Sequence, residues 1–366
     1  MKRIILANFT GYTVPTSIDF SDITINVGMN SVGKSTAVQA LLIVRQTFDE
    51  LTKYVGTKKQ DFRILLNGPY DLQLGDYTQI TPIGADTVLI KINDRSFFYN
   101  PGIDKFSLSF VGNSEPIPSS ECALFSPNFY YINAERLGPR NYQEIGNYQN
   151  MLCGYHGEYT FDVIEQFRDQ VIPETRRYPD PTHTASILSK QTEYWMDYIV
   201  PGIEFNVAKD IDTRTAKLKM RQTTLDTDFN SPHNFGFGIS YLLPIVVTGL
   251  LAQTGSVFVV ENPEAHLHPS GQSRIGQFLA HVAFSGVKVV LETHSEHVVN
   301  GIRLYALKHK VSPDRICINN FSIVNTNPRV DQIPLNANMD ILEWPEGFFD
   351  QEEKDLTELR HLRRMQ

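Results

Sequence analysis

The chain has 366 residues, 41% of them hydrophobic and 20% charged, and its formal net charge is -8. This composition is ordinary for a globular protein and argues against disorder or a fibrous repeat. The acidic balance disfavours a protein that coats nucleic acid through bulk positive charge, although a local basic groove stays compatible with it. Cys122, Cys153 and Cys317 are far apart and form no CxxC pair, so neither a disulfide framework nor a cysteine zinc site is expected.

No secretion signal is evident, because the N-terminus reaches Asn8 and Thr10 before an apolar run of signal-peptide length develops. The longest apolar stretch, residues 239–252, is interrupted by polar residues, proline and glycine. It is too short to span a bilayer and predicts a buried helix. We therefore expect a cytoplasmic protein without membrane contact.

The first third of the chain predicts strands, a loop, a helix and then more strands. Short β-type runs occupy residues 3–6, 16–20 and 23–27, and apolar residues recur at three- and four-residue spacings across residues 35–51, which indicates a helix. Alternating runs separated by Gly, Asn and Asp predict an antiparallel β-subdomain over about 62–130. A helical lobe and a hairpin that turns at 210–213 are expected over about 160–225.

The last third alternates helices with the apolar runs VFVVEN and VKVVLET, which is typical of parallel strands joined by crossover helices. The segment after Asp331 has no such rhythm. Together these patterns predict an α/β fold with a mixed core sheet.

A phosphate-binding loop is predicted at residues 28–36, where GMNSVGKST matches GxxxxGK[ST] between an expected strand and an expected helix. The glycines let successive backbone amides face a phosphate, and the helix N-terminus adds the positive end of its dipole. Lys34 should reach the β- and γ-phosphates of ATP, Ser35 should bind Mg²⁺, and Thr36 should contact the α-phosphate side. The expected nucleotide-binding residues here are Gly28, Asn30, Ser31, Val32, Gly33, Lys34, Ser35 and Thr36.

The apolar run 257–260 ends in Glu261, which predicts a Walker B carboxylate that joins Ser35 at the metal. Asn262 or Glu264 would orient the attacking water, and His294, after the next apolar run, would sense the γ-phosphate. Together with Glu261, these residues are the expected catalytic set. The cluster of Glu264, His266 and His268 leaves a zinc or manganese site open as an alternative.

These motifs resemble the ABC/SMC-like ATPases, in particular the stand-alone bacterial AAA-type ATPases that carry a DUF3696-type C-terminal region. The resemblance runs almost end to end. It rests on NFTGY, INVGMNSVGKST, YINAERLGPR, GFGISYLLPIV, VVENPEAHLHPSGQSRIGQFLA, ETHSEHVVNGIR and the tail motif WPEGFFDQEEKDL. It implies a P-loop NTPase of the ABC/SMC-head type, with an ATPase domain over 1–330 and a C-terminal extension over 331–366.

The resemblance also implies a homodimer that shares ATP and Mg²⁺ between its subunits. Gly236, Gly238 and Ser240 would take the part of the ABC signature and bind the γ-phosphate of ATP held by the other copy. Their order departs from the usual serine-glycine signature. Asn262 stands where a glutamate usually polarises water, so hydrolysis is expected to be slow, with help from Glu264 or His294.

By resemblance, the output would be control of a companion nuclease or toxin in bacterial anti-phage defence. A DNA-repair or DNA-sensing ATPase that acts directly on nucleic acid is the main alternative. A P-loop kinase is a weaker one, since it needs a substrate pocket and a lid but no signature segment. Arg136 and Arg140 leave two interpretations open, namely surface ion pairs or a role at a nucleotide or nucleic-acid interface.

Overall fold

The computed structural model describes residues 1–53, 62–112, 117–146, 152–225, 228–343, 345 and 348–365. Within these residues the strands form three sheets, and the central one has the order β15-β14-β3-β13-β12-β8. Five of its strands run parallel and β15 pairs antiparallel at one edge. The strands are β3 (Ile23–Gly28), β8 (Phe129–Ile132), β12 (Val257–Glu261), β13 (Lys288–Glu292), β14 (Ile316–Val324) and β15 (Asn327–Gln332).

A second sheet is antiparallel and has the order β2-β1-β5-β6-β7-β4. Its strands are β1 (Arg3–Ala7), β2 (Thr16–Asp19), β4 (Phe62–Leu65), β5 (Val88–Ile92), β6 (Arg95–Pro101) and β7 (Ser107–Val111). The sheet thus recruits the two N-terminal strands, which lie outside the range 62–130 expected for this subdomain. By contrast β8, at the end of that range, pairs with β12 in the central sheet.

The third sheet has the order β10-β11-β9 and belongs to a helical lobe. The predicted hairpin is confirmed, because β10 (Ile203–Asp210) pairs with β11 (Thr215–Gln222) and places Asp210 opposite Thr215. The remaining elements of the lobe are β9 (Tyr142–Glu144), α3 (Thr160–Gln166) and α4 (Leu188–Ile199). Short helical segments elsewhere are α2 (Tyr77–Ile80), η1 (Pro69–Asp71), η2 (Ala123–Phe125), η3 (Glu174–Arg176), η4 (Thr223–Leu225), η5 (Pro232–Asn234) and η6 (Pro313–Arg315).

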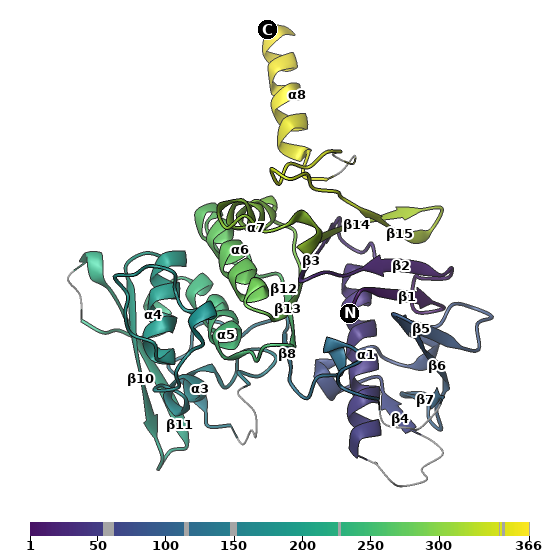
Figure 1. The fold of residues 1–366 in the computed structure, drawn as a ribbon, viewed down its shortest axis with the longest axis horizontal. Helices are drawn as coiled ribbons and strands as arrows, with labels where there is room; N and C mark the ends of the chain where they lie inside the picture. The colour runs from purple at the N-terminus through teal and green to yellow at the C-terminus, as the bar shows by residue number, and fades with distance from the viewer. Residues whose placement is uncertain are drawn as a thin grey trace.

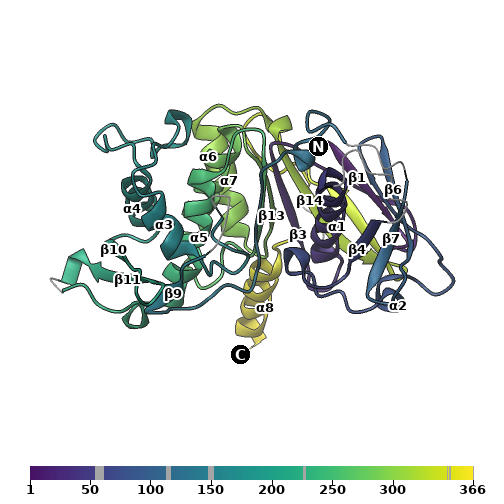
Figure 2. The ribbon, with the colours of Figure 1, turned by 90° about the horizontal axis from the view of Figure 1, so that it is seen from below.

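The central sheet separates two hydrophobic cores. On one face α5 (Phe237–Leu251), α6 (Pro269–Phe284) and α7 (Glu296–Lys308) lie between the sheet and the lobe, and on the other α1 (Lys34–Lys53) is enclosed by the antiparallel sheet (Figures 1 and 2). The alternation along β12 explains this division, since Phe258 and Val260 enter the first core while Val257 and Val259 enter the second. A strand buried on both faces reads as a continuous apolar run, as 257–260 does.

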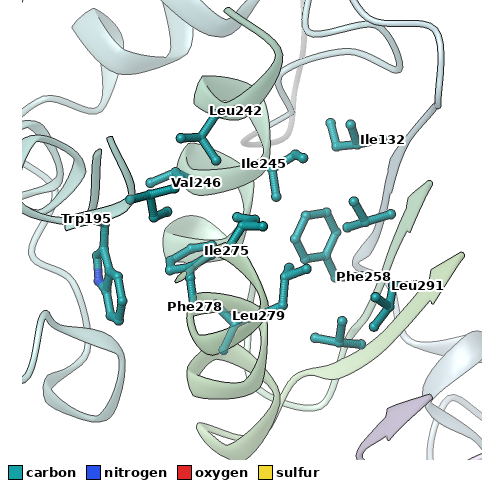
Figure 3. Packing of buried hydrophobic residues seen from close by; sticks show 14 of the residues in the cluster. Ile132, Trp195, Leu242, Ile245, Val246, Phe258, Ile275, Phe278, Leu279 and Leu291 are labelled. Atoms are coloured by element: carbon teal, nitrogen blue, oxygen red, sulfur yellow. The ribbon is translucent and has the colours of Figure 1, made fainter. Parts of the chain in front are cut away.

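The first core is dominated by aliphatic and aromatic side chains at the meeting of α4, α5, α6 and β12 (Figure 3). Trp195 of α4 packs edge-on against Phe278 of α6, with ring centroids 4.9 Å apart. The helix predicted at 239–252 is α5, which is buried along most of its length. None of the described helices has both the length and the apolarity needed to cross a membrane.

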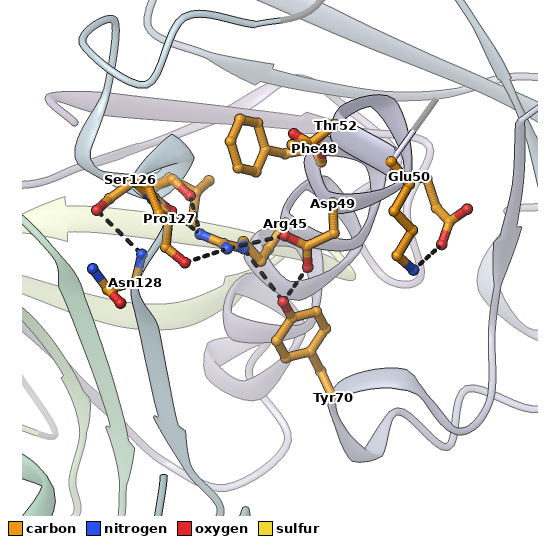
Figure 4. Close-up of polar contacts among 11 residues, drawn as sticks. Arg45, Phe48, Asp49, Glu50, Thr52, Tyr70, Ser126, Pro127 and Asn128 are labelled. Atoms are coloured by element: carbon orange, nitrogen blue, oxygen red, sulfur yellow. Dashed lines mark hydrogen bonds and ion pairs between the residues drawn. The ribbon is translucent and has the colours of Figure 1, made fainter. Parts of the chain in front are cut away.

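Arg45 anchors α1, the helix that begins at the phosphate loop, to the chain leading into β8 (Figure 4). Its guanidinium donates to the carbonyls of Leu124 at 3.0 Å and Ser126 at 2.5 Å, and it pairs with Asp49 at 2.9 Å. A buried arginine is tolerated when its donors are satisfied in this way. The axis of α1, and with it the position of its N-terminus, is therefore fixed relative to the central sheet.

The C-terminal segment contains a helix that the sequence analysis did not anticipate, α8 (Gln351–Met365). It projects from the body of the protein beyond the β14–β15 hairpin (Figure 1) and exposes Leu356, Leu359 and Leu362. The expected domain boundary at 330 falls inside β15. Within the tail motif expected at 344–356, positions 344, 346 and 347 lie outside the described residues.

Acid should destabilise the fold through His281, which is buried between Trp195 and Tyr305. Burial lowers the pKa of His281 from 6.5 to about 4. Below pH 6.5 the unfolded chain takes up a proton that the folded chain refuses, so the free energy of unfolding falls by about 3 kcal/mol between pH 6.5 and 4 and is unaffected at higher pH. Denaturant titrations should show this loss in the wild type and a smaller one in His281→Asn.

His361→Asn, on the exposed helix α8, is the matched control for this measurement and should keep the wild-type pH dependence. An equally steep loss of stability in His281→Asn would contradict the assignment.

Candidate nucleotide-binding site

The phosphate loop connects β3 to α1, as the sequence predicts, and two glycines give it its shape. Gly28 and Gly33 have φ values of 136° and 102°. A Cβ atom at Gly28 would lie 2.3 Å from the carbonyl oxygen of Phe321, and one at Gly33 would lie 2.8 Å from the Tyr12 hydroxyl. Only glycine fits both positions, because backbone conformation and space exclude a side chain.

Lys34 and Ser35 begin α1 with their side chains directed at opposite parts of the site. The Lys34 ammonium donates to the carbonyls of Gly28 at 3.0 Å and Met29 at 2.6 Å, and burial lowers its pKa. The Ser35 hydroxyl donates to Glu292 Oε1 at 3.0 Å. The ammonium thus lies over its own loop, where an anionic phosphate would compete for it.

A cavity of about 520 Å³ opens over this loop, a volume within the usual range for ligand sites. Asn262, Glu292 and His294 close one side of it, while Ile323, Thr326 and Pro328 of the β14–β15 hairpin close another. The remaining lining residues are Thr10, Gly11, Tyr12, Asn30, Ser31, Gly33, Lys34, Ser35 and Thr36. Of the predicted loop residues, Gly28 and Val32 do not line the cavity, and the side chain of Val32 is buried in the second core.

Glu261 lies next to this cavity without lining it. It ends β12 in register with Glu292 at the end of β13, and its Oε1 accepts the Tyr131 hydroxyl at 3.0 Å. Burial, followed by the negative charge of Glu292, raises the pKa of Glu261 to about 7. Two carboxylates therefore lie side by side at the carboxyl-terminal ends of neighbouring parallel strands, which is where ligands bind in sheets of this kind.

Glu264 and His294 are joined by a backbone contact. Glu264 accepts the His294 amide at 2.7 Å and the Thr293 hydroxyl at 2.8 Å, so both of its oxygens hold the turn after β13. The imidazole of His294 lines the cavity and is only partly buried, and this partial burial, together with the positive charge of Lys34, lowers its pKa. A neutral imidazole able to donate one hydrogen bond therefore faces the phosphate loop at neutral pH.

Asn262 follows Glu261 in the left-handed region, with φ 44°, and lines the cavity. Its Oδ1 is buried and has no hydrogen-bond partner among the described residues. A non-glycine residue with positive φ next to an unsatisfied buried oxygen is typical of a site that a ligand or water completes.

Arg136, from the segment AERLGPR, ties the end of β12 to the loop after β8. It donates to the carbonyls of Asn133 and Glu261, both at 2.7 Å, and of Asn262 at 2.6 Å, and its guanidinium lies over the Tyr241 ring. The interpretation of Arg136 as a surface ion pair is wrong, because the residue is buried.

Removing this guanidinium should cost stability. Arg136→Ala removes a donor from three carbonyls, of which that of Asn262 keeps the Ala265 amide at 3.1 Å, and we expect the free energy of unfolding to fall by about 3 kcal/mol. Chemical denaturation measures the loss. Arg140→Ala, at an exposed position of the same segment, should change it by under about 0.5 kcal/mol. Equal effects of the two changes would show that the carbonyl contacts contribute nothing.

The expected signature residues lie at the beginning of α5. Gly236 is the N-cap of this helix, and Gly238 and Ser240 fall in its first turn. A Cβ atom at Gly238 would lie 2.6 Å from the His266 carbonyl oxygen, so glycine allows α5 to approach the turn after β12. None of the three residues lines the cavity over the phosphate loop.

The alternative zinc or manganese site is not supported by the geometry of its residues. His266 packs its ring against Phe237 and Tyr241, and His268 caps α6 by accepting the Ser270 amide. Glu264 is engaged elsewhere, as described above. Across the part of the chain that the structure describes, no group of three or more His, Cys, Asp and Glu side chains is placed to hold a metal.

Several cavity residues were missed from the sequence. Glu292 stands at the start of the quoted ETHSEH segment, but only strand pairing shows that it faces Ser35. Tyr12 belongs to NFTGY and donates to the Gly33 carbonyl at 2.9 Å, so it supports the phosphate loop from the connection between β1 and β2. No local signal marks the contributions of Ile323, Thr326 and Pro328.

Two family models match the chain. One is described as "AAA domain, putative AbiEii toxin, Type IV TA system" and matches residues 163–300, and the other, "Protein of unknown function (DUF3696)", matches residues 312–359. The first includes Glu261, Asn262, Glu264 and His294, and the second includes β14 and β15. No curated protein gives a significant match to the chain.

Among solved structures, an SMC head bound to the C-winged helix domain of ScpA is 13% identical, with a TM-score of 0.54, over 93% of this chain and 99% of that one. An SMC head with an extended coiled coil, from Pyrococcus furiosus and bound to the C-terminal domain of ScpA, is 12% identical, with a TM-score of 0.50, over 98% and 99%. This likeness shows the fold of an SMC head. The chain thus joins an SMC-head fold to one segment that matches the AAA model and a C-terminal segment that matches the DUF3696 model.

Proposed function

We propose that this chain is a dimeric switch that binds and hydrolyses ATP and thereby controls a separate effector protein. Support comes from one cavity in which a glycine-shaped phosphate loop, Lys34 and Ser35 face Asn262, Glu292 and His294. Backbone amides at a helix N-terminus, a lysine and a hydroxyl are the groups that a triphosphate needs. Residues 1–330 would form the ATPase domain and 331–366 its extension.

Binding of ATP would draw Lys34 away from the Gly28 and Met29 carbonyls and onto the β- and γ-phosphates, a charge-assisted contact that outweighs a neutral one. Asn30, Ser31 and Gly33 would direct backbone amides at the phosphates, with Thr36 on the α-phosphate side. The neutral His294 would donate a hydrogen bond to the γ-phosphate.

The residues present also fit Mg²⁺. Ser35 offers its hydroxyl, the Glu261–Glu292 pair offers carboxylates at the ends of two neighbouring strands, and Glu292 Oε2 is buried with no hydrogen-bond partner within the described part of the chain. Magnesium is commonly held by one or two carboxylates together with substrate phosphates. When bound, it would neutralise charge that develops on the β- and γ-phosphate oxygens.

The attacking water would be oriented from the ends of β12 and β13. Asn262 can donate to or accept from water but cannot take its proton, whereas Glu261 can once it is ionised. Glu264 holds the backbone of His294 and so acts on the water indirectly. Slow hydrolysis is expected because Asn262 cannot accept a proton, whereas burial raises the pKa of Glu261 to about 7 and so suits this carboxylate to act as the base near neutral pH.

A second copy would complete the site. The N-terminus of α5, with Gly236 exposed and Phe237 54% exposed, lies off the cavity of its own subunit, so it is free to contact ATP held by another. A γ-phosphate shared by two helix N-termini favours the dimer. When hydrolysis removes this phosphate, the two subunits can separate. ATP with Mg²⁺ should therefore double the molar mass in light scattering, and ADP should not. A molar mass that does not change when ATP and Mg²⁺ are added would contradict the proposed dimeric switch.

The effector is proposed to be a companion nuclease or toxin in bacterial anti-phage defence. The toxin system in the description of the AAA model supports this, and the SMC heads with similar folds are bound to another protein, ScpA. We place the switch in the cytoplasm, where ATP and reduced cysteines are found. Co-purification with the product of the neighbouring reading frame tests it, and ATP-dependent binding to duplex DNA without any partner would favour the DNA-acting alternative.

A further inference from the structure

We propose that Glu292, and not Glu261, is the carboxylate that binds Mg²⁺ opposite Ser35, an inference that rests on the proposed ATP site. Ser35 is the residue of a phosphate loop whose hydroxyl ligates the metal. A carboxylate that shares a hydrogen bond with this hydroxyl occupies the neighbourhood of the metal itself. In this structure that carboxylate is Glu292, with Oε1 3.0 Å from Ser35 Oγ.

The second oxygen of Glu292 is available for a ligand. The residue is 5% exposed and lines the cavity, yet Glu292 Oε2 has no hydrogen-bond partner among the described residues. A buried carboxylate oxygen without a donor costs free energy unless a cation or water completes it. Magnesium bound between Ser35 and Glu292 would satisfy this oxygen.

The order of strands places Glu292 nearer than Glu261 to the phosphate loop. In the central sheet β13 lies between β3 and β12, and Glu292 pairs with Asn26 of β3. Neighbouring strands are about 4.8 Å apart, so the end of β12 lies one strand further from the loop. A Walker B residue at the end of β12 has to reach across β13, whose own terminal residue already contacts Ser35.

Glu261 is also committed to other contacts. Its Oε1 accepts the Tyr131 hydroxyl, the Glu261 carbonyl accepts a bond from Arg136, and the residue does not line the cavity. The proposed division of roles therefore gives the metal to Glu292 and leaves Glu261 to the chemistry of the water. It also explains how a site with asparagine at position 262 keeps two carboxylates for two tasks.

The charges around the cavity favour a bound dication. Glu261, Glu264 and Glu292 lie close together, and the nearby cations that act on them are Lys34 and Arg136. Once Lys34 is engaged by the phosphates, Glu292 loses its cationic neighbour. A cation held between Glu292, Ser35 and the phosphates would replace it.

The test compares Glu292→Gln with Glu261→Gln in the full chain. Titration with a fluorescent ATP analogue, with and without EDTA, measures nucleotide affinity. Electron paramagnetic resonance measures the affinity of the ATP complex for Mn²⁺. We expect Glu292→Gln to weaken Mn²⁺ in the complex by about 10–100-fold while nucleotide affinity in EDTA stays unchanged. Glu261→Gln should keep wild-type Mn²⁺ affinity, and Ser35→Ala should lose it as Glu292→Gln does.

Unchanged Mn²⁺ affinity in Glu292→Gln, or an equal loss in Glu261→Gln, would overturn the assignment. Equal thermal melting curves for the two isosteric variants show that a difference between them does not come from misfolding. A different outcome would contradict the proposed function. If the wild-type chain binds no nucleotide with or without EDTA, the ATP site as a whole is wrong.

Discussion

Replacing Lys34 with alanine should abolish the proposed ATP binding and, with it, the proposed ATP-induced dimer. The ammonium sits at the first residue of α1 and contacts the carbonyls of the phosphate loop that a nucleotide would displace. A charge-assisted contact of this kind contributes about 3 kcal/mol, which corresponds to a loss of affinity of over about 100-fold. Calorimetric titration with ATP measures the first effect and light scattering the second.

Lys53→Ala changes a lysine in the last turn of the same helix, where the side chain is exposed, and is the matched control. It should bind ATP and dimerise as the wild type does. ATP-dependent dimers of Lys34→Ala at unchanged nucleotide concentration would rule out the shared site.

Glu261→Gln should trap ATP in the dimer without turnover. The change keeps the size of the side chain and its contact with Tyr131 but removes the only proton acceptor beside Asn262 in the run that ends β12. Loss of a general base lowers turnover by about 100-fold or more. Phosphate release should fall accordingly, while light scattering should show a dimer that persists long after ATP is added.

Glu193→Gln, at an acidic residue of α4 in the helical lobe, controls for the loss of one negative charge and should hydrolyse at the wild-type rate. Normal phosphate release from Glu261→Gln would remove Glu261 from the catalytic set.

The parts of the site that come from contiguous sequence could be predicted, and those that depend on strand pairing could not. The conformation of residues 28–36 could be predicted from Gly28 and Gly33, because it depends on local backbone geometry alone. Glu292 faces Ser35 only because β13 inserts between β3 and β12, and no periodicity in the sequence specifies that order. Val32 was expected at the phosphates by its place in the motif, yet it points into the core.

The same distinction holds for the fold. Parallel strands and crossover helices in the last third follow from apolar runs of strand and helix length, and they are confirmed. The recruitment of β1 and β2 into the antiparallel sheet is a long-range pairing, with Ile4 opposite Ile92, that short-range patterns do not reveal. In α8 the leucines at 356, 359 and 362 carried a helical spacing, but dense charges between them obscured it.

The β14–β15 hairpin connects the C-terminal region to the cavity over the phosphate loop. Strand β14 borders β3, the strand that carries the phosphate loop, and Thr326 at the hairpin turn forms part of the cavity rim. Further along the same chain α8 extends outward like a handle (Figure 1). A partner protein that binds α8 would therefore be connected, through the C-terminal chain, to the hairpin turn that borders the proposed ATP cavity.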